Sequence, residues 1–143
     1  MTCLIGITLK NRSKIGIVHR PFLDATSPYG QTYFGSPEIG VFRCKYDRNW
    51  TKEEYLSREI EYVPPFHPEE NVDESTHLRT VISLFHFSDV IKKSLSILMP
   101  CEYEKIGGAG NKFLLMVENK TDVYYYMNKG LSSWDVCAAE PLL

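Results

Sequence analysis

The first 22 residues most constrain what this chain can fold into. Two apolar, β-branched runs, "MTCLIGITL" and "IGIVHRPF", are separated by the polar turn "KNRSK", which predicts an antiparallel hairpin. Pro21 ends the second run because proline has no backbone N–H to donate to a sheet. Two further strand-like runs, "QTYFGS" and "IGVFRCKY", follow a loop rich in Gly, Pro and Ser. Residues 1–46 are therefore predicted to be a set of strands.

From about residue 80 to residue 143, strand patterns alternate with helix patterns. "TVISLF" predicts a strand, and "HFSDVIKKSLSILM" predicts a helix that Ser88 or Asp89 could cap. "YEKIGGAGNKFLLMVEN" predicts a short strand, a Gly-rich turn and a helix. "TDVYYYM" predicts another strand, and a last helix begins near Trp134. Such alternation is typical of a layered α/β or α+β fold.

Residues 47–79 differ in character from both flanks. They are charged, contain Pro64, Pro65 and Pro68, and show a helical pattern only in their first part. Their acidic cluster from Glu69 to Glu74 has no helical spacing that would bring its carboxylates together, so a solvated loop is favoured over a metal site. We predict an exposed acidic insertion here.

Composition excludes several classes of partner. The chain has 143 residues, 43% of them hydrophobic, which is enough apolar material for a core. Its net charge of −2 gives no field that would gather a nucleic acid polymer or an anionic membrane surface, and no run of 18 apolar residues could span a membrane. Because the four cysteines lack metal-site spacing, they are predicted to be free thiols in a reducing, cytoplasmic compartment.

The stretch "GGAGNK", from Gly107 to Lys112, lies between a predicted strand and a predicted helix. Glycines allow close approach of a ligand, a helix N-terminus offers unpaired N–H groups, and the lysine adds a positive charge. These are the properties of a phosphate-binding turn, although the spacing is neither that of a Walker loop nor that of a dinucleotide fingerprint. A turn that only allows tight helix packing is the alternative.

Trp134-Asp135 and His86 are the other candidates for chemistry. Asp135 at a helix start predicts an N-cap, or a carboxylate that the cap geometry holds toward a divalent cation. If the two strands that precede Lys112 and Asp135 are adjacent and parallel, both residues would lie at one sheet edge, where α/β folds bind ligands. His86, between two phenylalanines at a strand-to-helix junction, is either a ligand contact or a structural histidine. No zinc site and no covalent nucleophile is indicated.

Together these stretches resemble a family, the magnesium-dependent, lithium-sensitive phosphomonoesterases of the inositol monophosphatase type. The matching segments are "LIGITLKNRSKIGIVHRPF", "GQTYFG", "GGAGNK", "DVYYY" and "WDVCAAEPLL". The last is the most specific, because W-D-x-x-A after a strand is the family's second signature. The resemblance covers nearly the whole chain apart from the insertion, and implies a layered sandwich of helices and sheets, of which residues 1–143 would be a partial phosphatase domain.

Position by position, the resemblance implies a metal-binding carboxylate at Asp135 and phosphate contacts from Lys112 and Gly108. Ser83 and His86 fall where the family's nucleotidases present a small hydroxyl residue and a histidine to the nucleotide. The implied cofactor is Mg²⁺, with inhibition by Li⁺, and the implied ligand is a small phosphorylated metabolite. Oligomeric state is not readable from the sequence.

Two substrates fit this resemblance. "GGAGNK", the "WDVCA" pattern and His86 favour removal of the 3'(2')-phosphate from adenosine 3',5'-bisphosphate. "GQTYFG", "IKKSLS" and the insertion resemble the enzymes that remove the 1-phosphate of inositol polyphosphates. In place of the hydroxyl-rich run of the nucleotidases, this chain has "SLFHFS", with apolar Leu84, Phe85 and Phe87.

The resemblance also has gaps. The family's first signature, D-P-[IL]-D-[GA]-T, and its upstream metal-binding glutamate are absent, as are the segments that follow the W-D helix in the family. One aspartate holds Mg²⁺ weakly, since that ion needs several carboxylates or substrate phosphates. We therefore expect a fragment of a longer protein that is inactive or nearly so by itself. A catalytically inactive chain that binds a phosphorylated ligand is the non-enzymatic alternative.

Overall fold

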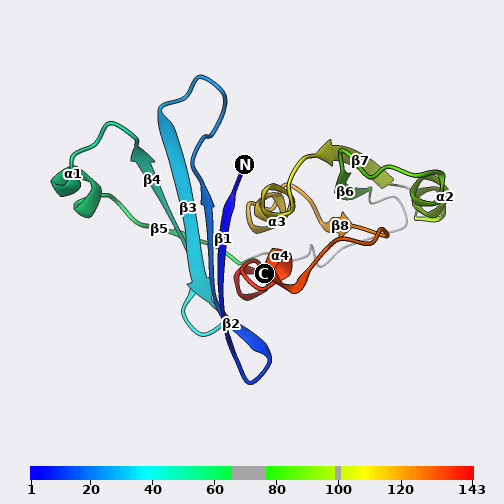
Figure 1. The fold of residues 1–143 in the computed structure, drawn as a ribbon, viewed down its shortest axis with the longest axis horizontal. Coiled ribbons are helices and arrows are strands. Elements are labelled where there is room, and N and C mark those ends of the chain that lie inside the picture. Colours follow the sequence, from blue (N-terminus) through cyan, green and yellow to red (C-terminus); the bar gives the residue numbers. More distant parts are fainter. Residues whose placement is uncertain (66–76, 99–100) are drawn as a thin grey trace. The chain divides into compact units, whose positions relative to one another are not determined.

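A computed structural model describes residues 1–65, 77–98 and 101–143 (Figure 1). The chain divides into two compact units. The first combines Met1–Pro65 with Ser132–Leu143, and the second is Phe66–Leu131. The acidic cluster from Glu69 to Glu74 lies outside the described residues.

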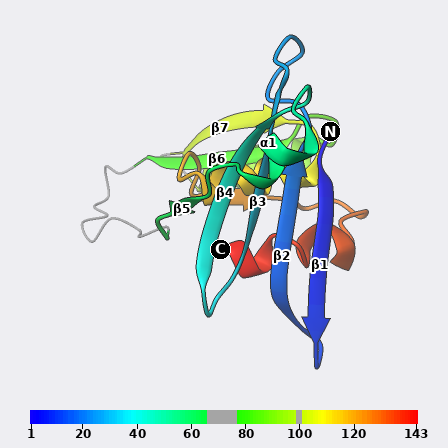
Figure 2. The same cartoon turned by 90° about the vertical axis from the view of Figure 1, so that its left-hand side faces the viewer.

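The first unit is built on a five-stranded antiparallel sheet with the strand order β1-β2-β3-β4-β5 (Figure 2). Its strands are β1 (Cys3–Leu9), β2 (Arg12–Arg20), β3 (Tyr29–Ser36), β4 (Gly40–Asp47) and β5 (Glu61–Val63). The predicted hairpin is confirmed, with a loop of only two residues, Lys10 and Asn11, both at positive φ. That backbone conformation matches the twist of paired strands, so Arg12 already belongs to β2.

Residues 47–65 are not a plain loop. Helix α1 (Lys52–Leu56) starts with a capping box in which the Glu54 side chain accepts the Thr51 N–H at 2.7 Å. β5 then pairs with β4 and adds a fifth strand to the sheet. Sequence patterns missed β5, because three residues are too few to show alternation. That residues 47–79 form an inserted segment stays a prediction.

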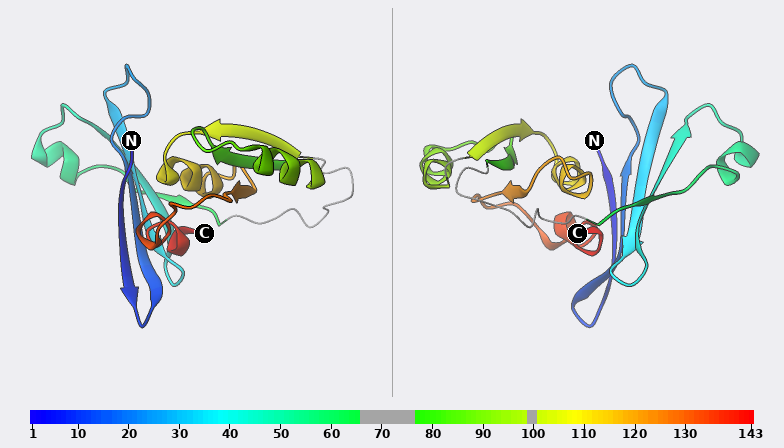
Figure 3. Two further views of the ribbon diagram at one scale, coloured as in Figure 1. Left: turned by 45° about the vertical axis from the view of Figure 1, so that its right-hand side comes forward. Right: turned by 180° about the vertical axis from the view of Figure 1, so that it is seen from behind.

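The last twelve residues pack on one face of this sheet, as both views in Figure 3 show. They form the one-turn helix α4 (Ser133–Val136) and the 3₁₀ turn η1 (Glu140–Leu142). Ala138, Ala139 and Leu142 are buried there. Gly6 and Gly16, which pair across β1 and β2, provide a surface without side chains for this segment.

The second unit contains a parallel sheet with the order β7-β6-β8. Its strands are β6 (Leu78–Ser83), β7 (Cys101–Ile106) and β8 (Val123–Tyr125), and its helices are α2 (Asp89–Ile97) and α3 (Ala109–Val117). Figure 1 shows the sheet between α2 and α3. Ile82 packs with Ile91 and Leu95 of α2, while α3 contacts β6 and β8.

These elements confirm the predicted mixed α/β class. Ser88 is the N-cap of α2, and its Oγ accepts the Ile91 N–H at 3.4 Å, as the sequence allowed. β6 begins at Leu78, two residues before the predicted strand, because Leu78 pairs with Cys101. All four cysteines are free thiols, as predicted. Within the described residues no helix has the length and apolar character needed to cross a membrane.

The sheet face opposite α4 is apolar and partly exposed. Ile5 and Ile7 on β1 and Ile15 on β2 are about half exposed, and Phe42 and Tyr62 continue the apolar row across β4 and β5. The Phe42 and Tyr62 rings meet edge to face, with centroids 5.7 Å apart. Contiguous apolar surface of this kind favours association between molecules.

An Ile7→Lys substitution tests that expectation. The variant should self-associate less at high protein concentration, because a charge now sits in the apolar row. Its unfolding free energy should change by no more than about 0.5 kcal/mol, since the replaced side chain is half exposed. Light scattering against concentration measures the effect, and Val90→Lys on the exposed side of α2 is the control. Equal association of the two variants and the parent would contradict the prediction.

Candidate functional site

The Gly-rich turn lies at the carboxyl end of β7 and starts α3. Gly108 is the N-cap of α3 with φ +79° and ψ 137°, a conformation that glycine adopts without steric cost. With no capping side chain at Gly108, the first amides of a nine-residue helix have no side-chain acceptor there. The Asn111 Nδ2 donates to the Gly107 carbonyl at 3.1 Å and closes the turn.

Lys112 is held inside this turn. Its side chain is only 3% exposed, and its Nζ donates to the Gly108 carbonyl at 2.8 Å and the Ile106 carbonyl at 3.4 Å. The ammonium also lies 5.0 Å from the centroid of the Tyr124 ring. The positive charge is therefore fixed behind the glycine backbone, where it adds to the positive end of the α3 dipole. An anion at the turn would be attracted by the Lys112 charge and by the positive end of the helix dipole.

Ser83 and His86 lie at the carboxyl end of β6. Ser83 Oγ and His86 Nδ1 are 3.0 Å apart, and the His86 ring meets Tyr126 edge to face at 6.2 Å. The Asn128 Nδ2 donates to the His86 carbonyl at 3.0 Å. The exposed imidazole is thus held from both sides, with Nε2 as the ring nitrogen that remains for a ligand. The sequence patterns did not identify Tyr126 and Asn128 as site residues. Their position just after β8, at the carboxyl end of a parallel strand, was the signal that could have identified them.

The parallel sheet brings these two segments together. Ser83 pairs with Ile106 in the strand register, and the Leu84 N–H donates to the Ile106 carbonyl at 3.1 Å. The four predicted substrate-binding residues, Ser83, His86, Gly108 and Lys112, therefore lie at the carboxyl ends of neighbouring parallel strands. This is the edge at which open α/β sheets bind ligands.

Asp135 belongs to the first unit, and its predicted N-cap role is wrong. The N-cap of α4 is Ser132, and Asp135 sits three residues later, where its Oδ2 accepts the Ser132 N–H at 2.9 Å. Asp135 could be the N-cap only of a helix that starts at Val136, whereas α4 starts at Ser133 and so places Asp135 inside its single turn. This hydrogen bond still orients the half-buried carboxylate and leaves Oδ1 for another partner.

The predicted adjacency of the two strands is also wrong. β6 lies between β7 and β8, so the turns after β7 and β8 are not neighbours in the sheet. Asp135 follows β8 by ten residues and packs with the antiparallel sheet of its own unit. That Asp135 and Lys112 serve one site stays a prediction.

The described residues do not by themselves make a magnesium site. Nowhere in residues 1–65, 77–98 and 101–143 do three His, Cys, Asp or Glu side chains gather in a way that could hold an ion. Mg²⁺ binds hard oxygen ligands in near-octahedral geometry and needs more than one carboxylate or phosphate to lose its water. Asp135 is the one predicted ligand in this chain.

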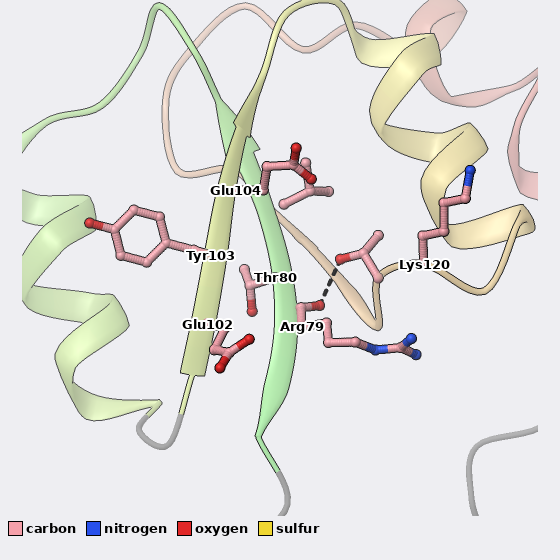
Figure 4. Close-up of a pocket in the computed structure, with 8 residues that line it drawn as sticks. Arg79, Thr80, Glu102, Tyr103, Glu104 and Lys120 are labelled. Carbon is pink, nitrogen blue, oxygen red and sulfur yellow. Dashed lines mark hydrogen bonds between the residues drawn. The ribbon is translucent and has the colours of Figure 1, made fainter.

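A depression of about 270 Å³ lies elsewhere on the second unit (Figure 4). It is lined by residues near the amino ends of β6 and β7 and just after α3, and these include the acidic Glu102 and Glu104 and the basic Arg79 and Lys120. Arg79 forms an ion pair with Asp122 at 2.6 Å, and this hydrogen-bonded partner lowers the pKa of the Asp122 carboxyl. Because both signs of charge line it at the end of the sheet opposite His86, this depression is not the predicted phosphate site.

Comparison with known proteins assigns a class to this arrangement. The chain shows distant homology, along its whole length, to curated phosphatases. No family model matches it.

The relatives are 3'(2'),5'-bisphosphate nucleotidases. The protein of Dictyostelium discoideum is 27% identical over 150 residues, which cover 98% of this chain and 41% of the relative. Those of Mus musculus and Homo sapiens are 25% and 23% identical over 147 residues, or 100% of this chain and 40% of theirs. The chain thus spans about two fifths of the length of these curated relatives.

Proposed function

We propose that this chain forms the phosphate- and nucleotide-binding part of a metal-dependent phosphomonoesterase. The substrate would be a small bisphosphorylated metabolite, and adenosine 3',5'-bisphosphate, losing its 3'-phosphate, fits best. The observation that best supports this proposal is that the Ser83–His86 pair lies next to the Gly108 turn and the buried Lys112 charge. The homology of the whole chain to bisphosphate nucleotidases supports the nucleotide over an inositol polyphosphate.

The residues of this chain have distinct parts in the proposal. The first amides of α3 donate to no capping side chain and so would be available to phosphate oxygens, with Lys112 supplying charge behind them. His86, fixed by Ser83 and Tyr126, would bind a second polar group of the same ligand. Asp135 would contribute one carboxylate to Mg²⁺, the ion that activates water in such phosphatases. A reducing, cytoplasmic location suits the four free thiols.

The 143-residue chain alone is expected to bind this ligand without turning it over. It should bind adenosine 3',5'-bisphosphate in calorimetry, and release of inorganic phosphate should stay at the buffer background with or without Mg²⁺. The reason is that one candidate carboxylate cannot assemble the metal site. Magnesium-dependent, lithium-sensitive phosphate release by the purified chain would overturn the expectation of inactivity. Failure of every phosphorylated ligand to bind would overturn the proposed function.

A further inference from the structure

Phe85 is an exposed aromatic ring at the edge of the candidate site. It is 78% exposed in the loop that joins β6 to α2, next to His86 in sequence. Scattered exposed apolar side chains are common on proteins and need no explanation. The position of this one matters, because it lies at the carboxyl ends of the parallel strands, where ligands of such sheets bind.

The Phe85 ring lies against the Gly-rich turn. A Cβ added at Gly107 would be 3.6 Å from Phe85 Cε2, an ordinary van der Waals distance. The backbone of the same loop is tied to β7 through the hydrogen bond from Leu84 N–H to the Ile106 carbonyl. The ring therefore borders the turn that offers amides to a phosphate, within one residue of the braced imidazole.

The second phenylalanine beside His86 has a different environment. Phe87 is half buried, its ring packs with Tyr103 at 5.6 Å, and the Lys105 ammonium lies 3.8 Å from its centroid. Phe87 is thus part of the packing between α2 and the sheet. Phe85 is the member of the pair that presents its ring to solvent.

We propose that Phe85 is a stacking platform that selects a phosphate ester carrying a planar heteroaromatic base over one carrying a polyhydroxylated ring. A nucleobase has a flat π face that can lie on an aromatic side chain while its phosphate reaches the adjacent turn. An inositol ring has no such face, and its hydroxyls need hydrogen bonds that a phenyl ring cannot give. This inference rests on the proposed function and assigns it a specificity-determining residue.

The test compares three ligands on the 143-residue chain in NMR titrations: adenosine 3',5'-bisphosphate, inositol 1,4-bisphosphate and adenosine. Phe85→Ser should weaken binding of the adenosine bisphosphate by about tenfold or more, since stacking on one aromatic side chain is worth that much. Adenosine should lose affinity by a similar factor, and the inositol bisphosphate should be unaffected. Phe85→Trp should restore the adenosine ligands. Ile97→Ser on α2, a residue with the same 78% exposed fraction, is the matched control.

Each outcome decides between the ideas. If the parent binds both bisphosphates equally and Phe85→Ser weakens both or neither, the platform is wrong while the phosphate site stands. If adenosine binds through Phe85 but no bisphosphate binds better than adenosine, the platform stands and the proposed phosphatase function fails. If no adenosine ligand binds, or if Ile97→Ser has the same effect as Phe85→Ser, the platform is overturned. Weakened self-association of Phe85→Ser with unchanged ligand binding would instead mark a protein contact.

Discussion

A Gly16→Ala variant is expected to lose the packing of the C-terminal segment against the antiparallel sheet. A Cβ at residue 16 would lie 2.1 Å from the Ala138 carbonyl oxygen and 3.2 Å from Leu142 Cγ. The first of these is a backbone atom and cannot rotate away, so the whole segment has to shift. Overpacking of a buried site costs about 1–3 kcal/mol, and we expect the upper end here.

Urea unfolding followed by circular dichroism measures this loss. Limited proteolysis should also cut the variant within residues 132–143 faster than the parent, because those residues carry α4 and η1. Gly107→Ala is the control, as its new Cβ would meet nothing closer than 3.6 Å. An unchanged unfolding midpoint together with unchanged cleavage would show that the segment does not depend on this contact.

The same variant should also affect Asp135, the predicted metal ligand of the first unit. Asp135 sits on α4, and α4 contacts β1 within the first unit. If the segment detaches, the hydrogen bond from Ser132 N–H to Asp135 Oδ2 no longer holds the carboxylate in one orientation relative to the sheet. We therefore expect Gly16, which lies on β2 far away in sequence, to help position the predicted metal ligand on α4.

A Lys112→Met variant is expected to lose most of the affinity for adenosine 3',5'-bisphosphate while keeping its fold. Methionine has nearly the length of the lysine stem and suits a site that is 3% exposed. The charge behind the Gly108 turn disappears with it, together with the two hydrogen bonds to backbone carbonyls. Loss of those two bonds lowers the stability of the turn, while the loss of affinity comes from the charge: a charge-assisted interaction with the phosphate is worth about 1.5–3 kcal/mol, which is roughly tenfold to a hundredfold in affinity.

Calorimetry of parent and variant measures this loss, with circular dichroism to show that the fold is retained. Lys120→Met is the matched control, because it removes the same charge beyond the other end of α3, where Lys120 pairs with Glu118 at 2.5 Å. Equal weakening by both variants would mean that only net charge matters. Unchanged affinity in Lys112→Met would show that the Lys112 charge does not contribute to phosphate binding at this turn.

Much of the secondary structure could be predicted from short patterns. The opening hairpin, the Ser88 cap and the helix after the Gly-rich turn depend on residues within a few positions of one another. Local propensity and spacing decide such features. β5 was missed for the opposite reason: Val63 is in a strand only because Val41, 22 residues earlier, pairs with it.

For the candidate site, too, the residue types could be predicted from the sequence and their spatial arrangement could not. The sequence singled out Ser83, His86, Gly108 and Lys112 one by one, through residue type and resemblance. Their arrangement at one sheet edge depends on the parallel pairing of β6 with β7, and the bracing of His86 by Tyr126 and Asn128 depends on β8 joining the same sheet. These pairings join residues 23 and 43 positions apart in the chain, which no local pattern specifies.

By itself, the sequence determined the mixed α/β class, the Gly-rich turn that can bind an anion, and the W-D stretch on which the family resemblance rests. Only the tertiary structure decided what the last residues do. Ser132 rather than Asp135 caps α4, and the segment that follows packs where Gly6 and Gly16 leave the sheet without side chains. The physical reason is that the backbone of this segment can approach the sheet only where two paired strands both lack a side chain. Which residues are paired is decided by the tertiary structure, because the strands and the segment are far apart in sequence.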